Sequence, residues 1–504
     1  MSDISTKSPS QLSQIKLLLD ALHNNDILYC HWKSNQHLSD SMTGATDLDI
    51  LFDEKQKVKI ESILNNLGYK LFQAIKQKQY KDIVDFIGLD LGAGKVIHVH
   101  THYRLTLGEP FLKGYQLDFE SKILESRVIN EDYGIFCINP AFELILLFLR
   151  ESLKLRHRDV LLMNLKIKAQ NRENILEEYN WLRARVTDPE IYTFLKTIFK
   201  DYTRIYEIVI NEFNRKKLKM LARIIKRELA GNRLYTPLEA LVTRWNREVK
   251  ILISRKLGKY FAYPIVSKRI NPRGGLSVAL MGADGSGKST VARYLKETFE
   301  DKLDIYEIYF GRGDGKSSHS RKILTSIKRL FAPEKMKKSS GITQYVSARN
   351  NSLIRSTYKC MEAILVAREK RIKMKQMKLA KNKGMLVICD RFPQNQIMGY
   401  NDGPLLHSFL KSNNFIYRTA AKMESKVYAM AENNPPDIIF KLIANPELVE
   451  ARKPGETSLE RLDNKIQGIK KMNFNNKCQV ITIDAGISLN EVLYKIKKEI
   501  WNFL

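Results

Sequence analysis

Residues Gly282 to Ser289 form the strongest chemical pattern in the sequence, because they fit the spacing G-x-x-x-x-G-K-[ST]. Glycines in such a loop let successive backbone N–H groups turn toward phosphate oxygens, and the N-terminus of a following helix adds a positive dipole. Lys288 is expected to pair with the β- and γ-phosphates of a nucleotide, and the hydroxyl of Ser289 to ligate Mg²⁺. The pattern therefore predicts binding of ATP or GTP together with Mg²⁺.

Such a loop must lie between a strand and a helix, and the surrounding sequence predicts both. Residues 276–282 are a short apolar run, which is typical of a buried parallel strand. Further strands of this type are predicted at 304–310, 385–390, 437–443 and 479–484, with a final helix at 488–504. Because strands alternate with helical sequence, we predict a parallel sheet with helices on both faces over residues 276–504.

The complete loop, G-x-D-G-x-G-K-S-T, resembles that of thymidylate kinase and related nucleoside monophosphate kinases. In that family one strand ends in Asp-Arg, and residues 387–392 (VICDRF) are similar to it. A later strand of the family begins with Pro-Asp and leads to the lid, and residues 435–453 (PPDIIFKLIANPELVEARK) are similar to this region. The resemblance implies a P-loop kinase-like domain that transfers the γ-phosphoryl group of Mg·ATP. Asp390 is then expected to hold Mg²⁺ through water, Arg391 to clamp the acceptor's phosphate, and Asp284 to face the acceptor.

These implied roles define the predicted site. The catalytic residues are Lys288, Asp390, Arg391 and Asp284. The residues expected to contact the nucleotide are Gly282, Ala283, Asp284, Gly285, Ser286, Gly287, Lys288, Ser289, Thr290 and, from the lid segment, Arg452. Ser289 and Asp390 are the implied magnesium ligands. The alternatives are a strand-end ion pair for Asp390 with Arg391, and a solvated helix face for Arg452.

The segment that reads the acceptor departs from the family. Thymidylate kinases usually follow Asp-Arg-Tyr with Ser-x-x-Ala-Tyr-Gln-Gly, whereas residues 392–406 are FPQNQIMGYNDGPLL. Gly399, Gly403 and Pro404 indicate a loop where the family has a helix. We therefore expect a phosphorylated acceptor other than dTMP, either another nucleotide or a sugar or lipid phosphate of polysaccharide assembly.

Asp47 and Asp49 form a second candidate centre near the N-terminus. Two residues apart in a predicted strand at 47–52, they project to the same face and could share divalent metal ions. Residues 31–52 resemble the signature of the polymerase-β-like nucleotidyltransferase fold, although Lys33-Ser34 replaces the usual Gly-Ser turn. The resemblance implies metal-assisted nucleotidyl transfer. A degenerate binding domain without catalysis is the alternative.

Three histidines alternate in the next predicted strand, at residues 95–103. His98, His100 and His102 should share one face, so a metal site there is geometrically allowed, and ordinary strand-surface histidines are the alternative. Proteins of the polymerase-β-like nucleotidyltransferase fold usually have a third carboxylate on such a strand. Asp90 is the candidate substitute for it in this sequence.

The chain is expected to contain several domains. Residues 1–130 mix predicted strands and helices and should form an α+β nucleotidyltransferase-like domain, whereas residues 131–261 have helical periodicity and should form a basic helical domain. Residues 262–275 are rich in Pro and Gly and are predicted to be a linker. With the P-loop domain at 276–504, the predicted fold class is multidomain α/β.

Composition limits the class of protein. The 504 residues are 44% hydrophobic and 28% charged, which excludes a disordered chain and a bundle of membrane spans. Five scattered cysteines without a Cys-x-x-Cys pair exclude a disulfide scaffold and a cysteine zinc site, and they fit a reducing compartment. We therefore expect a cytoplasmic protein.

Positive charge is concentrated in one region of this basic chain, whose formal net charge is +29. Residues 213–273 contain 17 basic and three acidic residues. Such a run suits a polyanion, either nucleic acid or an anionic membrane surface, for which residues 250–266 are a basic amphipathic candidate. One alternative function is therefore a nucleic-acid-binding protein whose P-loop domain is an ATP-driven switch or an end-processing kinase, and another location is the inner face of the membrane. Solvated helix faces are the third interpretation.

Overall fold

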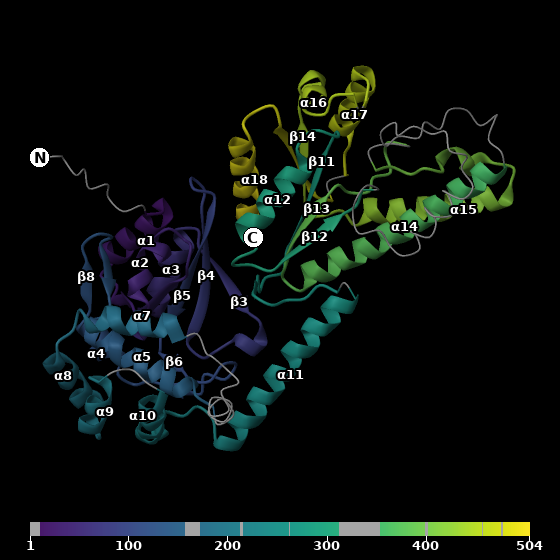
Figure 1. Ribbon diagram of the computed structural model, residues 1–504. Helices are drawn as coiled ribbons and strands as arrows, with labels where there is room; N and C mark the ends of the chain where they lie inside the picture. Colours follow the sequence, from purple (N-terminus) through teal and green to yellow (C-terminus); the bar gives the residue numbers. More distant parts are fainter. Residues whose placement is uncertain are drawn as a thin grey trace, which may run out of the picture. The chain divides into compact units, whose positions relative to one another are not determined.

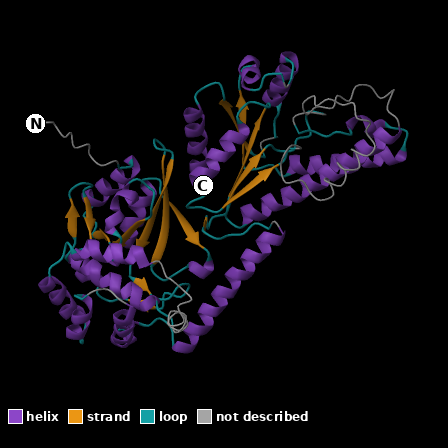
Figure 2. Cartoon of the chain, viewed as in Figure 1, coloured by secondary structure: helices purple, strands orange, loops and turns teal. Residues whose placement is uncertain are grey.

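The computed structural model describes residues 11–156, 172–211, 215–261, 263–311, 353–398, 402–455, 457–474 and 477–504. Contacts between Cα atoms divide the chain into two compact units, residues 1–261 and 262–504 (Figure 1). Both units contain helices and strands, so the fold is mixed α/β (Figure 2).

The first unit is built on one large mixed sheet. Its strands lie in the order β3-β4-β5-β2-β1-β9-β8. Their bounds are Tyr29–His31 (β1), Leu48–Phe52 (β2), Lys70–Ala74 (β3), Ile83–Asp90 (β4), Lys95–His102 (β5), Val128–Asn130 (β8) and Ile135–Cys137 (β9). A separate pair joins β6 (Thr106–Leu107) to β7 (Tyr115–Gln116). The strands predicted around Asp49 and the histidines are confirmed as β2 and β5, and β5 lies between β2 and β4.

One face of this sheet is apolar and packs against helices. The N-terminal helices are α1 (Ser13–Asn24), α2 (Leu38–Met42) and α3 (Lys57–Asn66). Leu48 and Ile50 of β2 and Ile97 and Val99 of β5 are buried in one core with α1 and α3. Because side chains alternate along a strand, the residues between them, among them Asp49, lie on the opposite face.

The first unit has further helices, all of which except α11 contribute to a second core with the strands. They are α4 (Glu120–Glu125), α5 (Pro140–Lys154), α7 (Arg172–Arg183), α8 (Asp188–Ile198), α9 (Tyr202–Val209), α10 (Arg215–Glu228) and α11 (Pro237–Phe261). Asn139 caps α5 by accepting from the N–H of Ala141, with Pro140 in the first turn. Trp32 and Leu51 are buried with the apolar face of α5. Helices are observed in the described part of residues 131–261, as the periodicity predicts. The predicted domain boundary between residues 130 and 131 stays a prediction.

The second unit contains a five-stranded parallel sheet in the order β12-β13-β11-β14-β15. The strands are β11 (Leu276–Gly282), β12 (Ile305–Tyr309), β13 (Leu386–Asp390), β14 (Ile438–Ile443) and β15 (Gln479–Asp484), and the short β10 (Arg269–Ile270) precedes them. All five predicted strands of this region are confirmed. The central position of β11 brings the carboxyl ends of its neighbours β13 and β14 beside its own.

Helices cover both faces of this parallel sheet. They are α12 (Lys288–Phe299), α14 (Leu353–Asn382), α15 (Phe415–Asn433), α16 (Pro446–Arg452), α17 (Leu459–Lys471) and α18 (Leu489–Phe503). Both α12 and α14 contact β11, β12 and β13, and β13 is buried along its whole length. A strand covered from both sides must be apolar throughout, as predicted for these runs. None of the helices in the described part of the chain is long and apolar enough to span a lipid bilayer.

Candidate functional site

The predicted phosphate loop connects the end of β11 to the start of α12. Gly285 and Gly287 have φ angles of +90° and +91°, a backbone region that L side chains rarely adopt. The loop therefore depends on glycine at these two positions. Because α12 begins at Lys288, the N-terminus of that helix points its N–H groups and its positive dipole end into the loop.

Lys288 is buried inside the loop, with 5% of its surface exposed. Its ammonium group donates to two carbonyl oxygens of the loop, at 2.9 and 2.7 Å. Burial and the charge of Arg391 together lower the pKa of Lys288 to about 8, although Asp284 and Asp390 oppose this change. The cation is thus held where a bound phosphate would need it.

Ser289 and Asp390 place two oxygen donors side by side. Asp390 is the last residue of β13 and is paired in register with Leu280 of β11. The Ser289 hydroxyl donates to Asp390 Oδ2 at 2.6 Å. The buried Oδ1 of Asp390 has no hydrogen-bond partner among the residues that the structure describes. A hydroxyl next to a carboxylate with an unsatisfied oxygen is the hard donor type that Mg²⁺ prefers, so these residues fit the ion.

Arg391 is fixed between two carboxylates. Its Nη2 lies 2.5 Å from Asp284 Oδ1, and its Nη1 lies 3.4 Å from Asp402 Oδ2. Burial would lower the pKa of Arg391, but these two carboxylates outweigh burial and raise it. Its φ of +70° is unusual for a long side chain, and such strained residues cluster at functional sites.

Asp284 joins Arg391 to the loop. Burial alone would raise the pKa of Asp284, yet the positive charges of Arg391, Lys288 and Lys465 lower it to about 2. Lys465 Nζ lies 3.6 Å from Asp284 Oδ2. Asp402 and Lys465 were missed by sequence reasoning, because neither belongs to a recognisable motif near the loop.

A cavity of about 410 Å³ opens beside the loop. Residues 284–291 line it together with Arg391, Arg452 and Lys453. Arg452 ends α16 and donates to the carbonyl oxygen of Ala485 at 3.0 Å. The structure thus brings the predicted lid arginine to the same cavity as the loop. Gly282 and Ala283 lie outside this lining, where their carbonyls receive the Lys288 ammonium.

The segment after Arg391 holds itself in shape with its own amide side chains. Gln394 is fully buried, donates to the carbonyl of Ile397 at 2.8 Å, and accepts from the N–H groups of Gln396 and Ile397 at 2.7 Å. The amide of Gln396 pairs with the main chain of Asn473. Residues 402–406 are not helical, in agreement with the predicted loop, whereas residues 399–401 lie outside the described residues.

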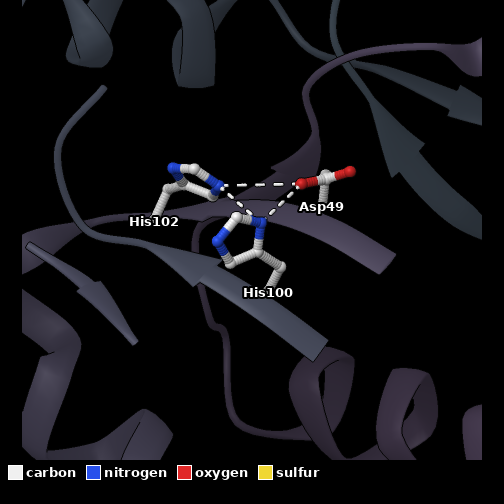
Figure 3. Close-up of side chains that lie close together, drawn as sticks. All are labelled: Asp49, His100 and His102. Atoms are coloured by element: carbon white, nitrogen blue, oxygen red, sulfur yellow. Dashed lines mark hydrogen bonds and ion pairs between the residues drawn. The ribbon is translucent and has the colours of Figure 1, made fainter. Parts of the chain in front are cut away.

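The carboxylates of the first unit lie beside the histidines of β5. Figure 3 shows Asp49, His100 and His102 pointing toward one another, with Asp49 Oδ1 2.9 Å from His100 Nδ1 and 3.7 Å from His102 Nε2. Lys33 Nζ lies 2.9 Å from the same oxygen. Burial lowers the pKa values of both histidines. Burial would raise the pKa of Asp49, but Lys33 and the two histidines hold it well below its usual range.

His98 has different neighbours from the other two histidines. Its Nδ1 lies 2.9 Å from Asp47 Oδ2, and its Nε2 lies 2.7 Å from Asp85 Oδ1 on β4. Asp90 accepts hydrogen bonds from the start of α1 instead of approaching this group. Asp85 is therefore the third carboxylate here. No motif in the sequence singles it out. That Asp47 and Asp49 share divalent ions stays a prediction.

The basic run at residues 213–273 uses part of its charge within the first unit. Lys226 donates to the carbonyl of Leu155 at 2.6 Å, Arg247 donates to the carbonyl of Phe111 at 3.0 Å, and Arg244 forms an ion pair with Glu109. These contacts reduce the number of cations left for a partner. A polyanionic partner therefore stays a prediction.

Comparison with known proteins adds relatives for part of the chain. No protein-family model matches it. The sequence is 26% identical over 225 residues to "Uncharacterized ATP-binding protein YghR" of Escherichia coli, which covers 44% of this chain and 86% of that protein. It is 25% identical over 217 residues to E. coli "Uncharacterized ATP-binding protein YghS", with 43% and 88% coverage. A "Probable thymidylate kinase" of Archaeoglobus fulgidus is 25% identical over 231 residues, with 45% and 95% coverage.

These relatives match the C-terminal half, where the loop, β13 and the lid arginine converge. Together with the strand–loop–helix geometry, they support a P-loop kinase-like domain in that half of the chain.

Proposed function

We propose that residues 276–504 form an ATP-dependent phosphotransferase of the thymidylate and nucleoside monophosphate kinase type. The observation that carries this proposal is the convergence of Lys288, Ser289, Asp390 and Arg391 at the carboxyl ends of β11 and β13. Ligands of open α/β sheets bind at this edge, where the chain leaves neighbouring strands for helices on opposite faces. The names of the relatives, ATP-binding proteins and a probable thymidylate kinase, also favour this function.

The residues divide between the two substrates. The loop N–H groups and Lys288 bind the β- and γ-phosphates of ATP, and Arg452 lies at the same cavity. Ser289 and Asp390 hold Mg²⁺, which supplies neutralisation of phosphate charge when bound. Arg391 clamps the phosphate of the acceptor, since guanidinium matches phosphate in a bidentate manner. Its Nε has no hydrogen-bond partner within the described residues.

Asp284 orients Arg391 and does not accept a proton. A carboxyl group whose pKa is about 2 is a weak base at neutral pH. The attacking oxygen of a phosphorylated acceptor needs no general base, because a phosphate monoester is already largely ionised at pH 7. Catalysis therefore rests on positioning two anions and neutralising the charge that develops between them.

The acceptor is a phosphorylated small molecule, either a nucleotide or a sugar or lipid phosphate. A thymine pocket must pair the polar edge of the base, and each unpaired buried group costs about 1–3 kcal/mol. Gln394 and Gln396 are engaged within their own segment and with Asn473, which argues against a thymine-reading wall there. For this reason dTMP is not the proposed acceptor.

An acceptor screen tests this function. The full chain is incubated with Mg²⁺ and ATP labelled in the γ-phosphate, together with nucleoside monophosphates, sugar phosphates and lipid-linked phosphates. Label should move to at least one phosphorylated acceptor, and a Lys288→Met variant should abolish the transfer. A wild-type protein that binds no ATP in calorimetry and labels none of these acceptors would contradict the proposal.

The other predicted activities remain open to direct tests. Nucleotidyl transfer at Asp47 and Asp49 predicts pyrophosphate release from a nucleoside triphosphate, which is lost in an Asp49→Asn variant. Nucleic-acid binding through residues 213–273 predicts an affinity that falls steeply with salt. The cytoplasmic location likewise stays a prediction.

A further inference from the structure

The ligand atoms of Asp49, His100 and His102 form a triangle (Figure 3). Asp49 Oδ1, His100 Nδ1 and His102 Nε2 are separated by 2.9, 3.3 and 3.7 Å. A tetrahedral Zn²⁺ ion holds imidazole nitrogens at about 2.0–2.1 Å, which places neighbouring ligand atoms about 3.3 Å apart. The observed edges are centred on this value, so a small tetrahedral ion fits above the triangle with little movement of the side chains.

The donor types select among metals. Two imidazoles with one carboxylate suit Zn²⁺ and related transition metals, whereas Mg²⁺ prefers oxygen ligands alone. A neutral imidazole offers one ring nitrogen with a free lone pair as a metal ligand. His102 is 1% exposed, and its Nδ1 has no hydrogen-bond partner in the part of the chain that the structure describes. Its Nε2 faces Asp49 and lies 3.3 Å from His100 Nδ1, so metal binding at Nε2 requires the ring proton to sit on Nδ1.

We propose that Asp49, His100 and His102 bind one transition-metal ion of the Zn²⁺ class on the face of the sheet opposite α1 and α3. Three protein ligands leave a fourth position open, as in catalytic zinc sites. This site differs from the oxygen-ligated pair expected for Asp47 and Asp49, because it uses one carboxylate and two strand histidines. It also belongs to the first unit and does not depend on the kinase-like function of the second.

His98 is excluded from the ligand set by its own partners. Both of its ring nitrogens lie within 3 Å of carboxylate oxygens, on Asp47 and Asp85. The Nε2 of His100 lies 4.0 Å from Asp85 Oδ1, so the same carboxylate is near the outer nitrogen of one ligand. Carboxylates next to the far side of a metal-binding histidine commonly orient its ring.

Lys33 competes with a metal ion for Asp49, because its ammonium group lies 2.9 Å from Oδ1 and repels a cation bound to that oxygen. Lys33 has a flexible stem and is 26% exposed, so it can swing into solvent. Removing its charge should therefore strengthen metal binding. Removing a ligand residue should have the opposite effect and weaken metal binding.

The experiment uses the full chain, stripped with a chelator and titrated with Zn²⁺ alone in competition with a chromophoric chelator. Wild-type protein should bind one equivalent of Zn²⁺ that Asp49→Asn and His102→Gln variants bind at least 100-fold more weakly. A His37→Gln variant, which removes an exposed histidine of the same unit, should match wild type. A Lys33→Met variant should bind Zn²⁺ about tenfold more tightly.

The wild-type protein alone provides a second measurement that does not depend on how the variants fold. Co²⁺ should give the visible spectrum of a four-coordinate nitrogen and oxygen site, without the near-ultraviolet band of a thiolate from one of the five free cysteines. A thiolate band, equal Zn²⁺ affinity in folded Asp49→Asn protein, equal affinity for Mg²⁺, or no gain in the Lys33→Met variant would each overturn the assignment.

Discussion

Replacing Lys288 by Met tests the proposed kinase site, because it removes the cation while nearly keeping the volume of the side chain. The ammonium group is held against two loop carbonyls at 2.9 and 2.7 Å, where it would meet the β- and γ-phosphates. Losing one such transition-state contact typically costs about 3 kcal/mol or more, on the order of a hundredfold in rate. We expect kcat/KM for phosphoryl transfer to fall by at least that factor.

Stability should change in the opposite direction. The pKa of Lys288 falls from 10.5 to about 8 on folding, because burial disfavours the charged form. At about 1.4 kcal/mol per pKa unit, folding with the charged lysine costs about 3 kcal/mol below pH 8. The unfolded chain binds more protons between pH 8 and 10.5, so this cost diminishes as the pH rises through that window. The Met variant should therefore have the higher melting temperature at pH 7.5, and the difference should shrink toward pH 10.

The assay combines turnover with thermal unfolding of the same protein samples. Lys441→Met is the matched control, since Lys441 on β14 is also 5% exposed but donates to the carbonyls of Lys470 and Met472, outside the loop. This control should keep wild-type turnover. A folded Lys288→Met protein with unchanged turnover would refute the kinase assignment, and a lower melting temperature at pH 7.5 would refute the electrostatic reasoning.

Other changes in the second unit have distinct expected effects. Asp390→Asn removes the charge beside Ser289, so kcat should fall about 100-fold and respond less to Mg²⁺ concentration; an unchanged Mg²⁺ response would contradict this role. Arg391→Lys should raise the acceptor KM tenfold or more and leave the ATP KM unchanged, because lysine lacks the bidentate geometry. Gly287→Ala, at φ +91° with no atom within 4 Å, should lower stability by about 1 kcal/mol in a denaturant titration, through backbone strain alone. Steady-state kinetics should give dTMP a lower kcat/KM than the best acceptor of the screen.

The sheet of the second unit was predictable because each strand is specified by the composition of a short stretch of sequence. A parallel strand covered by helices on both faces must be apolar at nearly every position, and this composition is visible in six consecutive residues. The predicted strand at 385–390 is observed as Leu386–Asp390, and the predicted strand at 276–282 is observed at those same residues. The loop was predictable for the same reason, since glycine spacing within eight residues determines its backbone.

The partners of the loop were not predictable, because tertiary structure brings them from distant parts of the chain. Lys465 contacts Asp284 across more than 180 positions of sequence, and Asp402 reaches Arg391 from a turn that has no motif. The sequence identifies Arg391 as a cation at a strand end. It does not contain the information that two carboxylates fix its guanidinium, because this depends on how the phosphate loop and the segment after β13 pack.

The alternating pattern of the β5 histidines does not distinguish their surroundings. Alternation places His98, His100 and His102 on one face, and from the sequence alone the three are equivalent. The register of the neighbouring strands separates them, because β2 places Asp49 opposite His100 whereas β4 places Ile87 opposite His98. His98 is thereby held between Asp47 and Asp85, while His100 and His102 both face Asp49. A metal site built on all three histidines would require His98 to leave two carboxylates. The register of the strands therefore favours a ligand set of Asp49, His100 and His102.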